Sequence, residues 1–109
     1  MIANFSGTPK RLYQGAIGNT SSTIYTAQPD GKTAILDIMV VNTTSAPINF
    51  TMYIGSAAAG NAFGWYTSSI PAYSSMQYAG FQILNQSEVL LGVGSTTGLT
   101  ATISGIERV

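Results

Sequence analysis

The chain has 109 residues, enough for one domain with a substantial core but too few for a core plus a separate functional lobe. Only 7% of the residues are charged, against about 25% in an average soluble domain, and four basic and four acidic side chains cancel to zero. This composition provides no positive field for phosphate backbones, so nucleic acid is excluded as an expected partner.

The first nine residues show no strand pattern, and residues 1–9 are predicted to form a flexible N-terminal arm that is ordered only when something binds it. Polar residues and glycine interrupt the apolar residues of the arm, so no signal peptide is expected. Elsewhere every apolar run ends within about ten residues, short of the roughly 20 that a membrane-spanning helix needs. The sequence therefore predicts no membrane partner, and the folded domain is placed at residues 10–109.

The rest of the chain predicts β structure, because no window repeats apolar residues at the helical spacing and β-branched residues, Ser and Gly are frequent. Turn signals such as QPDG at residues 28–31 and STTG at residues 95–98 separate the short apolar segments. The predicted fold class is therefore all-β, a single antiparallel β-sandwich or jelly-roll-like domain of about eight strands. In chain order the predicted strands are Arg11–Ala16, Thr23–Ala27, Thr33–Asn42, Ile48–Gly55, Phe63–Ser68, Ser75–Ile83, Val89–Gly94 and Leu99–Ile106.

The segment Thr33–Asn42 is apolar on both of its sides. A regular strand directs the even-numbered residues of 34–40 to one face, while Ile35, Met39 and Val41 make the opposite face apolar as well. One face enters the core, and we expect the other to pack under neighbouring subunits or a crossing loop. The next strand alternates cleanly and turns Tyr53 away from its apolar face. The candidate subunit-interface residues are Ile35, Met39, Val41 and Tyr53.

The polar residues give no indication of catalysis. The chain has no His and no Cys, which removes the usual general base, the thiolate nucleophile and most transition-metal ligands. The four carboxylates lie in turns, in a strand and at the C-terminus, so nothing predicts that two of them converge as in a glycosidase. We expect Asp30 and Glu88 to be solvated turn residues and Glu107 with Arg108 to form a solubilising tail. The prediction is a protein that is not an enzyme, with no cofactor and no metal site.

A lone carboxylate, Asp37, lies between Leu36 and Ile38 in an apolar segment. Burying an unpaired carboxylate is costly, so we expect Asp37 to have a hydrogen-bonding partner. The expected partner is a backbone donor or one of the cations Lys10, Arg11, Lys32 and Arg108.

The aromatic segment FGWY at residues 63–66 leaves two functions open. Aromatic rings on one surface can form a stacking platform for sugars, as in carbohydrate-binding sandwiches. In a regular strand, however, Trp65 and Tyr66 point to opposite faces, which favours Phe63 and Trp65 as a packed pair in the core or at a subunit contact. A bulge near Gly64 would change this register.

Four short segments of the chain carry a resemblance to a known group of proteins: RLYQG at residues 11–15, YTA at 25–27, VVNTT at 40–44 and SGIE at 104–107. Over residues 10–107 the chain resembles small β-sandwich virion proteins encoded by tailed bacteriophages. The turn before Glu88 and the small-residue loop Ala57–Gly60 depart from the pattern of this group.

The resemblance implies a non-enzymatic structural component of a phage particle, either a capsid decoration or cement protein or a head- or tail-associated component. It implies self-assembly into a homo-oligomer, with a trimer favoured, and contact with other virion proteins such as a major capsid protein. The implied location is the virion, after synthesis in the host cytoplasm. The alternative that the sequence leaves open is a carbohydrate- or receptor-binding β-sandwich module.

Overall fold

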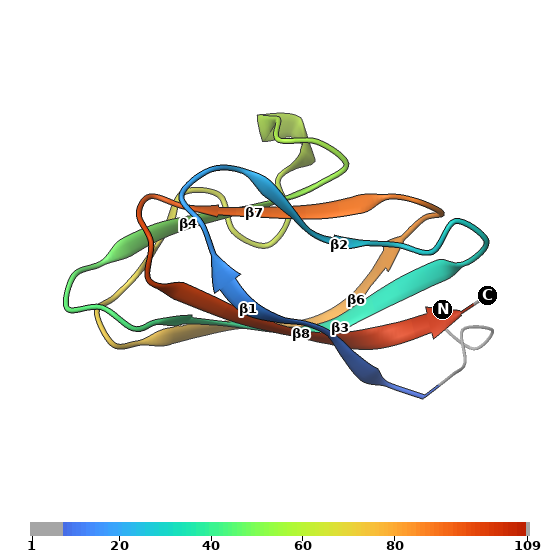
Figure 1. The fold of residues 1–109 in the computed structure, drawn as a ribbon, viewed down its shortest axis with the longest axis horizontal. Coiled ribbons are helices and arrows are strands. Elements are labelled where there is room, and N and C mark those ends of the chain that lie inside the picture. Colours follow the sequence, from blue (N-terminus) through green and yellow to red (C-terminus); the bar gives the residue numbers. More distant parts are fainter. Residues whose placement is uncertain (1–7, 109) are drawn as a thin grey trace.

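Two four-stranded antiparallel sheets packed face to face form the fold in the computed structural model, which describes residues 8–108 (Figure 1). We refer to them as sheet I and sheet II. The strands of sheet I, in spatial order, are β1 (Lys10–Ile17), β8 (Leu99–Arg108), β3 (Lys32–Asn42) and β6 (Ser75–Leu84). Those of sheet II are β2 (Ser22–Thr26), β7 (Val89–Gly94), β4 (Ile48–Ile54) and β5 (Ser68–Ile70).

The connections between consecutive strands cross from one sheet to the other, with one exception. The connection from β4 to β5 stays within sheet II, where the two strands are neighbours. This strand order is that of a jelly roll, an architecture that occurs in viral capsid and lectin domains. The predicted single antiparallel β-sandwich is confirmed.

The one helical turn among the described residues is η1 (Ala59–Asn61), a 3-10 turn in the loop that projects from sheet II in Figure 1. No helix within residues 8–108 has the length and apolar character needed to cross a membrane. The predicted arm is described only in part, since β1 begins at Lys10 and residues 1–7 lie outside the described residues.

The predicted strand Phe63–Ser68 is wrong, and the only strand in this region is the short β5. Gly64 has a φ of +77°, and the amide of Trp65 donates to the carbonyl of Phe63 at 2.8 Å, so the chain reverses there instead of extending. The aromatic rings of Phe63 and Trp65 are nevertheless packed against other rings. Trp65 is 6% exposed and meets Phe50 edge-on at 5.5 Å, which confirms packing, whereas Phe63 packs on Tyr78 at 5.0 Å and not on Trp65.

Strand β3 contains a bulge that decides which of its faces enters the core. The registers with both neighbouring strands shift between Ile35 and Asp37, so the alternation restarts at this point. Ile35 and Ile38 are both fully buried core residues, although a regular strand would place them on opposite faces. The prediction of Ile35 as a subunit-interface residue is therefore wrong, because the bulge turns its side chain into the core.

Candidate functional site

The charged residues gather at one end of the sandwich, and the loops of the opposite end carry none. The charged end contains the start of β1, the end of β8 and the loops at residues 27–31 and 85–88. The uncharged end contains the loops at residues 18–21, 43–47, 71–74 and 95–98. Seven of the eight charged residues belong to the charged end: Lys10, Arg11, Asp30, Lys32, Glu88, Glu107 and Arg108. The eighth, Asp37, lies between the two ends.

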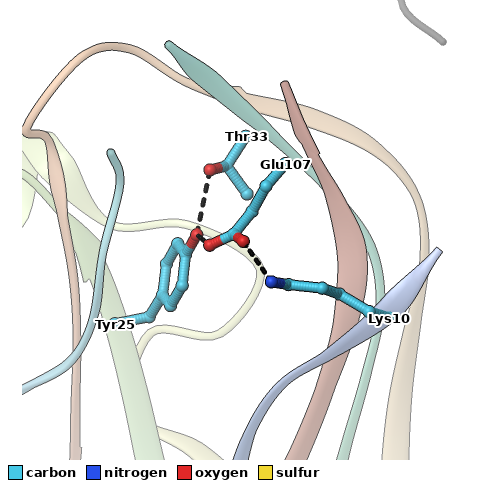
Figure 2. Close-up of polar contacts among 4 residues, drawn as sticks. All are labelled: Lys10, Tyr25, Thr33 and Glu107. Atoms are coloured by element: carbon cyan, nitrogen blue, oxygen red, sulfur yellow. Dashed lines mark hydrogen bonds and ion pairs between the residues drawn. The ribbon is translucent and has the colours of Figure 1, made fainter. Parts of the chain in front are cut away.

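At the charged end, four polar side chains close the space between the sheets (Figure 2). Sheet I supplies Lys10, Thr33 and Glu107, and sheet II supplies Tyr25. The hydroxyl of Tyr25 donates to one carboxylate oxygen of Glu107, and the ammonium of Lys10 pairs with the other. Because the Tyr25 proton is used in this way, the hydroxyl of Thr33 donates to the Tyr25 oxygen at 3.0 Å. We call these four residues the polar clasp.

The clasp holds its groups in their ordinary charge states. Burial, followed by the hydrogen bond to Glu107, raises the pKa of Tyr25 to about 12. The ion pair with Lys10, followed by the Tyr25 hydroxyl, lowers the pKa of the Glu107 carboxyl. A phenol that binds its proton more tightly and a carboxylate that binds its proton less tightly are poor nucleophile and general-base candidates, respectively. The arrangement joins the two sheets.

The role of Glu107 in the clasp corrects the prediction of a solubilising tail. Strand β8 extends through Glu107, and the core residues Leu99, Ala101 and Ile103 alternate along it. Two further steps of the same alternation bring residue 107 to the inner side of sheet I. The alternation along β8 therefore indicates from the sequence that Glu107 lies on the inner side. Its contact with Tyr25, 82 residues away, depends on the fold.

We expect the clasp to make stability depend on pH at the acid end. Since the folded-state pKa of Glu107 is lowered, its contribution is present above the unfolded-state pKa and is lost as the pH falls through the folded-state value. The melting temperature of Glu107→Gln should therefore fall less steeply on acidification than that of the unmodified chain. Asp30→Asn, in an exposed turn, is the matched control and should keep the original slope. Equal slopes in all three proteins would contradict the role of the clasp.

Two of the other carboxylates, Asp37 and Glu88, have partners of their own. Asp37 accepts a hydrogen bond from the side-chain amide of Gln77. The expectation of a partner is confirmed, but the partner is a neutral amide outside the predicted set of donors. Glu88 accepts from the backbone amide of Asn85 at 3.0 Å within its turn. Within residues 8–108 no group of three His, Cys, Asp or Glu residues is placed to hold a metal ion.

The remaining candidate interface residues lie on opposite faces of the sandwich. Met39 and Val41 are half-buried on the outer face of sheet I. Tyr53 lies on the outer face of sheet II, where it is the register partner of Leu91 in β7. Met39 and Val41 therefore belong to one surface and Tyr53 to another. A shallow hollow of about 240 Å³ on sheet II is lined by the uncharged residues Asn49, Thr51, Thr67, Val93, Gly94 and Ser95.

Comparison with known proteins adds no relative to this description: no family model matches the chain, and neither curated proteins nor solved structures give a match.

Proposed function

We propose that the chain is a non-enzymatic structural protein of a phage particle that acts through self-assembly. The observation that carries the proposal is that apolar side chains line the outer faces of both sheets in a chain with only 7% charged residues. A sandwich needs apolar residues only on its inner faces, and outer apolar rows are typical of surfaces that meet another protein.

The architecture supports this proposal. Jelly rolls form viral capsid domains, where their flat outer faces and loop ends are available for contacts between subunits. The fold alone does not define a function, but here it agrees with the resemblance of residues 10–107 to small virion proteins. The proposed role is capsid decoration or cement, or a head- or tail-associated position, in contact with a major capsid protein. The chain would then be found in the virion.

The outer face of sheet II is the proposed subunit contact. Tyr53 in β4 pairs with Leu91 in β7, and this row continues to Thr23 in β2 and to Ala62 in the projecting loop. An aromatic and an aliphatic side chain at the centre, surrounded by uncharged polar residues, have the composition of an interface hot spot. The hollow beside Thr51 provides space for a side chain of a neighbouring subunit.

Light scattering on the purified chain tests the self-assembly directly. We expect a homo-oligomer, with a trimer favoured, at tens of micromolar. Leu91→Ser combined with Tyr53→Ser should shift the mass to that of the monomer, because the pair forms the centre of the proposed contact. Thr100→Ala, on the outer face of sheet I, is the control and should leave the mass unchanged. A monomeric unmodified chain would overturn the proposal of self-assembly.

The virion location has its own test. Phage particles produced from a genome that carries the gene, purified by density gradient and analysed by mass spectrometry, should contain the chain. Its absence from purified particles, together with its presence in the lysate, would overturn the virion location while leaving self-assembly standing.

One observation favours the alternative, a carbohydrate- or receptor-binding module. Tyr73 is 73% exposed at the uncharged end. Its φ is +54°, a backbone conformation that residues other than glycine rarely adopt. Its amide donates to the carbonyl of Thr44 at 3.1 Å, which holds the backbone of Tyr73 on a loop end rich in hydroxyl groups. The residues 63–66, by contrast, offer only Tyr66 as an exposed ring. Calorimetric titration with neutral oligosaccharides, with Tyr73→Ala as the comparison, distinguishes this alternative.

A further inference from the structure

One edge of sheet I lacks the protection found at the other edges of the sandwich. Edge strands usually avoid pairing with other chains by being very short or by carrying charges, proline or a bulge. At the other edges, β1 contains Lys10 and Arg11, β2 has five residues with a register shift, and β5 has three residues and is followed by Pro71. Strand β6 has ten residues, none of them charged or proline. Its register with β3 is regular over Ser75 to Ala79, and we call this segment the open edge.

The backbone of the open edge directs hydrogen-bonding groups outward. The amide of Asn42 donates to the carbonyl of Ser74 at 2.8 Å, so these two residues form a bonded pair that continues the ladder between β3 and β6. Bonded and non-bonded pairs alternate in an antiparallel ladder, so the backbone groups of Ser75, Gln77 and Ala79 point away from β3. The part of the chain that the structure describes places no strand on that side, and all three residues are exposed. Their amides and carbonyls are therefore available to a further strand.

The sequence of the open edge is complementary to itself. When two copies lie antiparallel with Gln77 opposite Gln77, Ser75 lies opposite Ala79, so all the outward-facing residues oppose one another. Two bonds in each of these opposed pairs give about six backbone hydrogen bonds. In the same register the half-buried Met76 lies opposite Tyr78, which places a thioether beside an aromatic ring. The segment has no charged side chain, so no like charges face each other.

We propose that the open edge pairs with the open edge of a second copy, which joins two copies of sheet I into one continuous sheet. A second copy is the occupant because the two-fold register gives every residue of the segment a compatible partner. The pairing uses about five residues on each side, against roughly 20 to 30 in a stable interface, so it is weak between isolated chains.

The pairing adds a second contact to the proposed self-assembly. Because it is weak, it leaves the mass at tens of micromolar to be determined by the contact through sheet II. It uses neither the outer face of sheet II nor any other virion protein, so it holds whether or not those parts of the proposed function are correct.

A single engineered cysteine tests the position of the pairing, because the chain has none of its own. The background is the double variant Leu91→Ser with Tyr53→Ser, which removes the contact through sheet II. In this background Gln77→Cys places a thiol on the two-fold axis, and at about 1 mM protein a short bis-maleimide should link two copies. The matched control is Gln14→Cys, an exposed position on the edge strand β1 of the same sheet. We expect several times more cross-linked dimer from position 77 than from position 14.

Sedimentation equilibrium in the same background tests the backbone hydrogen bonds. The mass should rise from that of the monomer towards that of the dimer between about 20 µM and about 1 mM. Gln77→Pro removes an outward-facing amide without taking a bond from β3, so it should keep the monomer mass over the whole range. Gln77→Ala retains this amide and is the control, which should still show the rise. Circular dichroism verifies that the variants fold.

The other outcomes overturn the proposal. Equal cross-linking at positions 77 and 14 would indicate random collisions, and a rise in mass that persists in a folded Gln77→Pro would place the contact elsewhere. A monomer mass at about 1 mM would show that the open edge does not pair with a second copy. If Gln77→Pro does not fold, the comparison of positions 77 and 14 decides. A background that is already oligomeric at about 20 µM would instead contradict the contact through sheet II, and the same comparison still tests the open edge.

Discussion

Replacing Asn42 by Ala is expected to lower the free energy of unfolding by about 3 kcal/mol, because one buried and three partly buried hydrogen bonds are lost at once. The Asn42 side chain is fully buried at the end of β3. Its amide nitrogen donates to the carbonyls of Ala46 at 2.8 Å and Ile70 at 3.0 Å. Its amide oxygen accepts from the backbone amide of Thr44 at 2.9 Å and from the Thr44 hydroxyl at 2.7 Å. One side chain thus holds the loop at residues 43–47 against the end of β5.

Urea denaturation measures this effect as a shift of the midpoint at constant slope. Asn49→Ala is the matched control, since Asn49 is exposed and its contacts with Ser95 run through the backbone. We expect the control to stay within about 0.5 kcal/mol of the unmodified chain. A midpoint for Asn42→Ala equal to that of the control would contradict the role of Asn42 as the centre of this network.

Gly105→Ala is expected to destabilise the chain by about 3 kcal/mol through overpacking. A β-carbon at residue 105 would lie 2.1 Å from the carbonyl oxygen of Ala34 and 2.9 Å from a methyl carbon of Leu12. The Leu12 side chain can rotate, but the Ala34 carbonyl belongs to the backbone of β3, which pairs with β8. The two central strands of sheet I would have to separate at this point.

Thermal unfolding measures the effect of Gly105→Ala, and Gly18→Ala is its control. A β-carbon at residue 18 would meet no atom within 4 Å, so we expect the melting temperature of the control to change little. If both variants melt at the temperature of the unmodified chain, sheet I accommodates the methyl group and the close approach of β8 to β3 does not limit stability.

The alternation of apolar and polar residues is sufficient to predict those strands that have one polar outer face and one buried face. Strand β8 is the clearest example, with Leu99, Ala101 and Ile103 in the core. The same reasoning failed in β3, where both faces are apolar. The period of two then gives no preference between registers, and the bulge at Leu36 is decided by pairing with β8 and β6.

The polar features of the candidate site were the least predictable. In the sequence, Asn42 has the position of a turn residue at the end of a strand. Nothing near it indicates that the carbonyl oxygen of Ile70 will accept a hydrogen bond from its side chain. The clasp requires Tyr25 and Glu107 to meet across two sheets. Local sequence patterns fix which side of a strand a residue occupies, whereas contacts between distant strands depend on the connections of the whole jelly roll.

The position of β8 has a consequence for how the protein is made. Strand β8 lies between β1 and β3, although it is the last of the eight strands to be synthesised. Until it leaves the ribosome, the edges of β1 and β3 have no partner on that side, and the core lacks Leu99, Ala101 and Ile103. Pairings between segments so far apart in sequence are also slow to form. The nascent chain therefore passes through a period in which unpaired edges and apolar side chains are accessible, and its yield in the cell should depend on chaperones that bind such strands.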